Sequence, residues 1–288
     1  MKKKLFVLCA ISGLLLAGAA AFPAQANEKA ETGYDRVMRT HTLRCGYGSW
    51  DPGVYKDPQT GQMKGIVVEL TETIGKYSGI KIDWTAEVDW GQIPQSLSAG
   101  KVDAFCSGMA NDASRGKFMA FTHPWFYWPF GVMVRADDTR FPPNVVKLAD
   151  LNKSGYSTAY TEGDVLETIA KNEFPNVKGV PLPPLGTPAD NVMNLITRKT
   201  DFLALPKVFF QSFDKVNPGK LHYLTVDPAF RTYGSVIAVS IEDVRLQQLL
   251  NAGVDELLNS STYRQIMDKY ERNYPGAFLP VATAYATK

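Results

Sequence analysis

Apolar and polar positions between residues 42 and 109 follow helical and strand periods in turn. Helical spacing brings Ile66, Leu70 and Ile74 onto one face of a helix that a glycine ends. Together the patterns predict strands at 42–48, 80–87 and 102–109 and helices at 65–79 and 93–101. Strands and helices in strict alternation indicate a parallel sheet with helices on its faces.

The same alternation continues in the rest of the chain. It predicts strands at 127–138, 155–161, 201–205, 222–226 and 233–240, and helices at 163–174, 187–199, 244–258 and 262–270, with Thr187 as an N-cap. We therefore expect two α/β lobes, the second inserted within the first. Residues 27–136 and 231–288 would form lobe 1, and residues 137–230 would form lobe 2. Parallel sheets bind ligands in loops beyond the carboxyl ends of their strands, which here are 46–50 and 107–112.

The N-terminal segment has the pattern of a secretory signal peptide. Three lysines precede an apolar run, and Ala24, Gln25 and Ala26 follow it, so we expect cleavage after Ala26. Cys9 follows Leu8 rather than a small residue, which argues against a lipid anchor. Removing three lysines and no acids changes the formal charge from +2 to −1. The full chain has 45% apolar and 21% charged residues, and after cleavage we expect a soluble periplasmic protein that does not bind nucleic acid.

Six segments of the chain resemble one known family. They are LRCGYG, GQMKGIVVEL, IPQSLSAGKVDAFCSGM, SRGKFMAFTHPW, LITRKTDFLAL and LLNSSTYRQIMDKY, and they span nearly all of residues 40–272 in the family's order. The family is family 3 of the periplasmic solute-binding proteins, the polar amino-acid class, which serve ABC importers. The resemblance implies a type II periplasmic-binding-protein fold, with two hinge strands near 134–138 and 228–234. It also implies a monomer without a cofactor that works with a permease in the inner membrane.

The resemblance also implies where a ligand binds. In the family, an arginine and the loop after the SGM strand hold the carboxylate of the ligand, and Arg115 falls at that arginine. A guanidinium suits a carboxylate because it donates two parallel hydrogen bonds. The alternative is a surface arginine that bridges a helix turn. The ligand-binding residues implied are Trp50, Trp90, Ser107, Gly108, Met109, Ala110, Arg115, Gly163 and Asp164.

Asp164 leaves two interpretations open. It begins a helix of the second lobe, where family members commonly have Ser or Thr. It either caps that helix or directs its carboxylate into the cleft. Trp50 and Trp90 are expected to line the cleft, where aromatic faces attract ammonium groups and pack on aliphatic stems. Residues 125–128 (WFYW) are expected to lie mostly in the core.

Two positions depart from the family pattern. Where members usually place an aspartate for the ligand's amino group, this chain has Pro206 or its neighbour Leu205, so Asp51, Asp112 or Asp164 would have to substitute. Gly53 stands where phenylalanine is common. Both departures weaken the case for an ordinary α-amino acid as the ligand.

The cysteines and histidines indicate neither a catalytic nor a metal site. Cys45 and Cys106 lie in neighbouring predicted strands, and export would permit a disulfide between them. Two separate buried thiols are the favoured interpretation. His41, His123 and His222 form no spaced cluster, so no metal site is expected.

The leading hypothesis is a binding protein that captures a small carboxylate-bearing solute, an amino acid or a related compound, and is not an enzyme. The alternative from another class is an enzyme on the same scaffold, similar to a cyclohexadienyl or arogenate dehydratase. Asp112, Glu162 or Asp164 would then supply the acid or base. A third alternative is a ligand-sensing protein.

Overall fold

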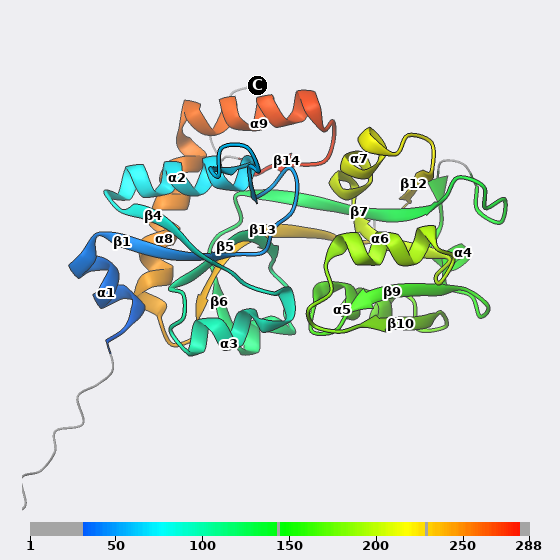
Figure 1. Cartoon of the computed structure of the whole chain (residues 1–288), viewed down its shortest axis with the longest axis horizontal. Helices are drawn as coiled ribbons and strands as arrows, with labels where there is room; N and C mark the ends of the chain where they lie inside the picture. Colours follow the sequence, from blue (N-terminus) through cyan, green and yellow to red (C-terminus); the bar gives the residue numbers. More distant parts are fainter. Residues whose placement is uncertain (1–30, 143–144, 228–229, 283–288) are drawn as a thin grey trace, which may run out of the picture. The chain divides into compact units, whose positions relative to one another are not determined.

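The structure, a computed structural model, describes residues 31–142, 145–227 and 230–282, and Thr32 begins one compact unit that takes in all later described residues. Its main strands pair in the order β10-β9-β11-β7-β13-β5-β1-β4 (Figure 1). This path runs from three strands of the second lobe, through two long strands shared by both lobes, to three strands of the first. The fold is therefore a mixed α/β fold, as the alternating pattern predicts. The signal peptide predicted at residues 1–26 lies outside the described residues.

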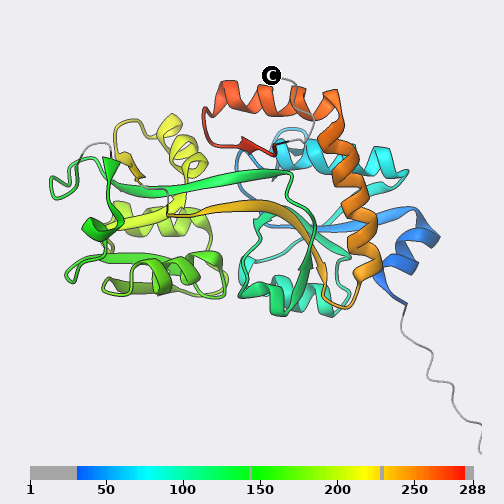
Figure 2. The ribbon, with the colours of Figure 1, turned by 180° about the vertical axis from the view of Figure 1, so that it is seen from behind.

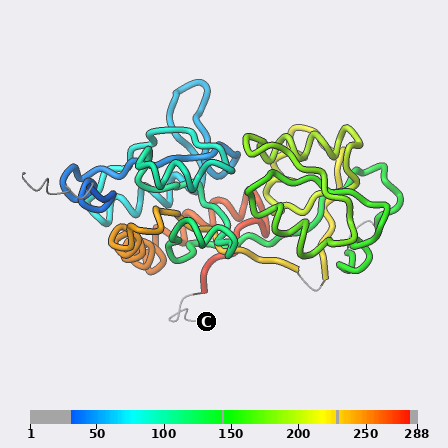
Figure 3. Tube along the Cα trace, turned by 90° about the horizontal axis from the view of Figure 1, so that it is seen from below, coloured from blue at the N-terminus to red at the C-terminus, as the bar shows by residue number. Residues whose placement is uncertain are grey.

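The first lobe is built on parallel pairing of β1 (Thr42–Tyr47) with β4 (Lys81–Glu87) and β5 (Ala104–Ala110). Every residue of β5 is buried, as expected for a strand covered on both faces. Helix α2 (Ile66–Ser78) packs against α8 (Val244–Asn259) and α9 (Ser261–Asn273), which are orange and red in Figure 2. The other elements of this lobe are α1 (Gly33–Thr40), β2 (Tyr55–Lys56), β3 (Met63–Lys64), α3 (Ile93–Ser98), β6 (Met119–Phe121) and β14 (Leu279–Pro280). The hairpin of β2 and β3, blue in Figure 3, stands out from the lobe.

The second lobe repeats the parallel arrangement with β10 (Lys178–Leu182), β9 (Ser157–Thr161) and β11 (Phe202–Pro206). Helices α5 (Val165–Glu173) and α6 (Pro188–Ile196) both pack on β9 and β11, and α7 (Lys207–Val216) follows β11 directly. The predicted cap of α6 is confirmed, because the Thr187 hydroxyl accepts a hydrogen bond from the backbone N–H of Asp190. The remaining elements are β8 (Val145–Val146), α4 (Leu148–Leu151) and β12 (Leu221–Val226).

Two long strands, β7 (Phe126–Arg135) and β13 (Thr232–Ser240), connect the lobes (Figures 1 and 2). Strand β7 pairs with β13 through Pro129, and from Phe130 onward it pairs with β11 of the second lobe. This change of partner lies ahead of the stretch 134–138 predicted for the first hinge. The sequence could not reveal it, because the strand is continuous through the change. The lobe boundaries at 136/137 and 230/231 stay a prediction.

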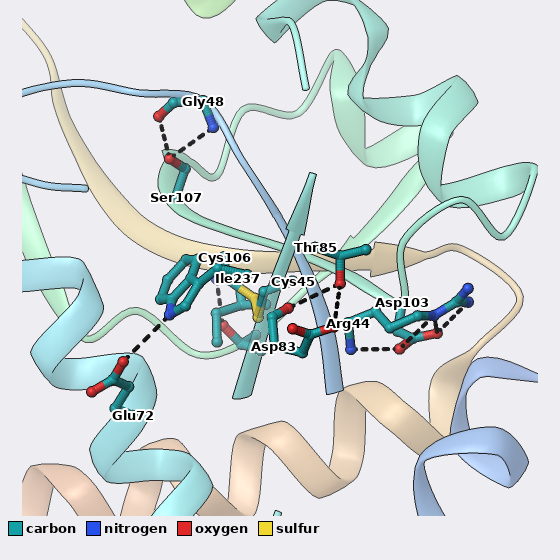
Figure 4. Close-up of a disulfide and its surroundings, with 12 residues drawn as sticks. Arg44, Cys45, Gly48, Glu72, Asp83, Thr85, Asp103, Cys106, Ser107 and Ile237 are labelled. Carbon is teal, nitrogen blue, oxygen red and sulfur yellow. Dashed lines mark hydrogen bonds and ion pairs between the residues drawn. A yellow bond between two sulfur atoms is a disulfide. The ribbon is translucent and has the colours of Figure 1, made fainter. Parts of the chain in front are cut away.

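A disulfide joins the two central strands of the first lobe (Figure 4). The sulfur atoms of Cys45 and Cys106 are bonded, and their Cα atoms are 5.5 Å apart. The structure thus differs from the favoured prediction of two separate thiols. The reason is the register of β1 and β5, which pairs Cys45 with Ala104 and so brings Cys106 within bonding reach.

Candidate functional site

A turn held by Asp112 places Arg115 at the seam between the lobes. Strand β5 ends at Ala110, and the Asp112 carboxylate then accepts hydrogen bonds from the backbone N–H (3.1 Å) and the hydroxyl (2.5 Å) of Ser114. The backbone N–H of Arg115 donates to the Asp112 carbonyl at 3.1 Å. Arg115 begins a short 3-10 turn there, and only 5% of its surface is exposed.

The Arg115 guanidinium reaches across the seam to the second lobe. Its Nε and Nη2 atoms donate to the Gly163 carbonyl at 3.0 and 2.8 Å, and Nη2 also donates to Asp164 Oδ1 at 2.9 Å. Within the described residues, Nη1 makes no hydrogen bond. These contacts rule out the alternative of a surface arginine that bridges a turn of its own helix. Instead, the side chain joins the two lobes and keeps one donor nitrogen unused.

Asp164 fulfils both interpretations that the sequence left open. Its Oδ1 atom accepts from the backbone N–H of Val165 at 2.6 Å and so caps α5. The same oxygen pairs with Arg115, while Oδ2 accepts no hydrogen bond from any residue that the structure describes. Gly163, with φ of +74°, turns its own N–H away to Glu167. Burial acts against it, but hydrogen bonds from Lys171 and Gly163 hold the pKa of Glu167 below its ordinary value.

A small cavity of about 30 Å³ lies at this seam. Most of its wall is carbon, and Arg115 and Asp164 are the ionisable groups on it. The lining residues are Trp90, Ala110, Arg115, Trp128, Phe130, Asp164, Val165, Leu166, Pro188, Leu205, Pro206 and Phe209.

The structure brings together only part of the predicted ligand-binding set. Of that set, the cavity is lined by Trp90, Ala110, Arg115 and Asp164. Ser107, Gly108 and Met109 line neither the cavity nor the two grooves beside it. Ser107 is fully buried and exchanges hydrogen bonds with the backbone of Gly48, as Figure 4 shows. Its hydroxyl therefore has a structural role.

Sequence reasoning missed the aromatic wall of the cavity. Trp128, expected in the core with its neighbours, is buried and also lines the cavity, beside Phe130 and Phe209. Leu205 and Pro206, the positions where the family has its aspartate, also lie on this wall. The position at which this chain lacks the family's aspartate therefore lies on the wall of the cavity, and the residues there are apolar. One signal in the sequence could have indicated this wall: Trp128 and Phe130 flank a proline on a strand that leads out of the first lobe.

Two grooves flank the cavity along the seam. The Trp50 groove, about 420 Å³, is lined by Ser49, Trp50, Asp51, Glu87, Thr187, Pro188, Ala189, Val192, Met193, Phe209, Ser212 and Phe213. The Phe118 groove, about 560 Å³, is lined by Gly91, Pro94, Ser114, Arg115, Phe118, Gly163, Asp164, Glu167, Thr168, Lys171 and Asn172. Partial burial raises the pKa of the Asp51 carboxyl, which the charge of Lys215 partly offsets. Predicted ligand residues Trp50 and Gly163 therefore lie in grooves on different sides of Arg115.

Direct contacts between the lobes accompany the cavity. The rings of Trp50 and Phe209 are 5.6 Å apart, and the Ser212 hydroxyl donates to the Asp51 carbonyl at 3.0 Å. On the other side, the Ser114 and Thr168 hydroxyls are 3.3 Å apart. Both walls of the seam therefore meet in this arrangement.

The second departure from the family pattern has a steric cause. A Cβ atom on Gly53 would lie 1.9 Å from the Trp50 ring. The indole nitrogen of Trp50 donates to the Ser107 carbonyl at 3.0 Å, which fixes the ring over Gly53. Trp50 thus occupies the space into which a larger residue at position 53 would have to fit.

Within the described ranges, no group of three or more His, Cys, Asp or Glu residues is arranged to hold a metal ion. In the same part of the chain, no helix combines the length and the apolar character needed to cross a membrane.

The fold and the site define a class before any relative is considered. The two α/β lobes joined by long strands match the fold of the type II periplasmic binding proteins. Residues 43–273 match the family model described as bacterial extracellular solute-binding proteins, family 3. The chain belongs to this family.

Curated and solved relatives agree with this assignment. The chain is 24% identical to an L-arginine-binding protein of Pseudomonas aeruginosa over 228 residues, which is 77% of this chain and 84% of that protein. It resembles the solved cysteine-binding protein of Campylobacter jejuni with a TM-score of 0.72 and 16% identity, covering 88% of this chain and all of that one. It also resembles an ancestral amino acid-binding protein described as a precursor of cyclohexadienyl dehydratase, with a TM-score of 0.68 and 23% identity over 82% of this chain and 98% of that one. At these identities the structural likenesses establish the fold alone.

Proposed function

We propose that this protein is the substrate-binding component of an ABC importer and captures a small solute that bears a carboxylate, an amino acid or a related compound. The solute binds in the seam between the lobes, and the closed protein presents it to a permease in the inner membrane. Export by a signal peptide cleaved after Ala26 would deliver it to the periplasm as a free monomer. The named relatives bind amino acids, which supports this range of solutes.

Arg115 is the observation that carries this proposal. It is a buried cation on the wall of the cavity, with Nη1 unused within the described residues. A ligand carboxylate could bind Nη1 and share or displace the bond that Nη2 makes to Asp164. Because a ligand between Arg115 and α5 contacts both lobes, it stabilises the closed arrangement more than the open one.

The enzyme alternative has less support. The Asp112 carboxylate accepts from Ser114 and Thr168 and does not line the cavity. Glu162 lines neither the cavity nor the two grooves. Asp164 is paired with Arg115. None of the three is positioned as an unpaired acid or base beside a bound solute, so prephenate should be released unchanged after incubation with the protein.

Calorimetric titration with the twenty L-amino acids, which include the arginine and cysteine named for relatives, tests the proposal. We expect saturable binding of at least one and a large loss of affinity in Arg115→Ala. Lys117→Ala is the matched control, because it removes an exposed cation from the same turn. Absence of binding across the panel, or equal affinities of Arg115→Ala and wild type, would contradict the proposal.

A further inference from the structure

Trp128 differs from the other buried tryptophans in the bonding of its indole nitrogen. Trp50 is 5% exposed and Trp125 is fully buried, and their Nε1 atoms donate to the Ser107 carbonyl at 3.0 Å and to the Ser235 hydroxyl at 2.8 Å, respectively. Trp128 is 5% exposed, and its buried Nε1 has no acceptor in the described part of the chain. Because the great majority of buried donors in proteins are paired, this one calls for an explanation.

The residues around Trp128 explain why an aromatic ring lies there, but they do not explain why the ring carries an indole N–H. The ring meets Trp50 edge to face at 5.4 Å and is tilted against Phe126 at 5.9 Å. These contacts fix its orientation and would be made almost as well by a phenylalanine. A buried N–H without a partner lowers stability, whereas a carbon ring of similar shape does not.

The position of Trp128 supplies the explanation. It lines the same cavity as Arg115, on a wall otherwise formed largely by carbon atoms such as those of Leu205 and Phe209. It also lies on β7 next to Pro129, where the strand changes its partner from the first lobe to the second. A bond from the ligand to this nitrogen would therefore form at the point where the two lobes join.

We propose that Trp128 is a specificity-determining ligand contact whose Nε1 donates a hydrogen bond to an acceptor atom of the solute. This inference rests on the proposed function and narrows the solute to one that presents an acceptor to the aromatic wall. The acceptor is either an oxygen of the carboxylate at Arg115 or a second group on the carbon framework. Solutes without a suitably placed acceptor are disfavoured, because they leave the buried N–H unpaired.

Unfolding measurements without any solute make the first test. Trp128→Phe and Trp125→Phe remove the same atoms from buried rings, but only Trp125 loses a hydrogen bond within the protein. We expect Trp125→Phe to lower the denaturant midpoint clearly more than Trp128→Phe does. Equal losses would mean that Trp128 is a structural residue and would overturn the inference.

Binding measurements make the second test, with L-glutamine and L-norvaline as the probes. The two have similar carbon chains, but only glutamine carries a side-chain carbonyl. We expect Trp128→Phe to weaken binding roughly 3- to 100-fold, while Trp125→Phe keeps wild-type affinity. A loss for both probes assigns the carboxylate as the acceptor, and a loss for glutamine alone assigns the side chain.

Indole resonances provide a readout that a structural role would not move. The chain has five tryptophans, so ¹⁵N-labelled protein gives five indole N–H peaks. The peak missing in Trp128→Phe should shift downfield when the probe is added, and the Trp125 peak should stay in place. Binding with an unmoved Trp128 peak would overturn this inference and leave the proposed function intact. Failure of the wild type to bind any amino acid of the panel would count against both.

Discussion

Two buried arginine–carboxylate groups, one inside the first lobe and one between the lobes, differ in how completely they are bonded. Asp103 is almost fully buried and accepts from the side chains of Arg36 and Arg44 and from the backbone N–H of Arg44, at 2.7 Å. Both of its oxygens are used. In the pair of Arg115 and Asp164, Nη1 and Oδ2 remain without partners among the described residues.

This difference in bonding distinguishes the Asp103 group, whose hydrogen bonds hold one lobe together, from the Arg115–Asp164 pair, which can still bind another group. A carboxylate with all its acceptor positions bonded inside one lobe can be replaced only at the cost of stability. A pair with an unused donor at the seam between two lobes still has a position at which a further hydrogen-bond acceptor can bind. Under the proposed function, similar residue types serve stability in one place and recognition in the other, and four experiments can break or sharpen this contrast.

The largest expected effect is on the Asp103 group. Asp103→Asn should lower the free energy of unfolding by about 3 kcal/mol, because it leaves two arginines without their shared anion. Amino-acid affinity should stay within about threefold of wild type, since the proposed binding site is at Arg115 and Asp164 and not at Asp103. Urea titration and calorimetry measure the two quantities. Asp83→Asn, an exposed strand carboxylate of the same lobe, is the control and should be nearly neutral. A small loss in Asp103→Asn would remove the contrast.

The disulfide should behave like the Asp103 group. Replacing Cys45 and Cys106 together by alanine should lower the free energy of unfolding by about 2–4 kcal/mol, since the bond closes a loop with a sequence separation of 61 residues. Solute affinity should not change, because neither cysteine lines the cavity or the adjoining grooves. Unfolding curves of the oxidised protein and the double variant provide the measurement, and coincident curves would show that the bond adds nothing.

Arg115→Lys tests the Arg115–Asp164 pair while keeping its charge. We expect binding of the best amino acid to weaken by about 1.5–3 kcal/mol, because one ammonium group cannot reproduce the planar donors of the guanidinium. The free energy of unfolding should fall by less than in Asp103→Asn, because the lysine keeps a positive charge beside Asp164. Calorimetry beside unfolding curves separates the two effects. Wild-type affinity in Arg115→Lys would show that charge alone is recognised.

The smallest effect concerns a third arginine group, in the second lobe. Hydrogen bonds from Arg140 lower the pKa of Asp138, and against the effect of burial they also lower the pKa of Asp201. An acid with a lowered pKa contributes stability above its unfolded pKa of about 3.9 and loses it as pH falls through the lowered value. Below about pH 4 the melting temperature of wild type should therefore fall more steeply than that of Arg140→Ala. Arg198→Ala, which breaks an exposed pair with Asp137, should follow the wild-type curve.

Much of the fold could be predicted because its signals are local. Apolar periods and glycine stops lie within single elements, and the cap at Thr187 depends on the three residues after it. The point where β7 changes its pairing partner could not be predicted in the same way. Strand β7 changes partner at Phe130 without any change in its own conformation, so the position depends on strands far away in sequence.

The candidate site, too, could be predicted only in part. Arg115 and Asp164 could be predicted from the family resemblance, because the family has an arginine after the SGM strand and a small polar residue at the start of a helix in the second lobe. Trp128 and Phe209 could not be predicted as cavity residues. The sequence pattern of an apolar side chain is the same whether it packs against another side chain or lines a cavity. The disulfide needed the register of β1 against β5, which no pattern within either strand contains.

The contact between Trp50 and Gly53 constrains how this site could change in evolution. A side chain at position 53 would overlap the Trp50 ring, so a larger residue there requires that ring to move or to be replaced. Loss of Trp50 alone removes a ring that meets both Trp128 and Phe209. A larger residue at position 53 would therefore also disturb the aromatic wall of the cavity.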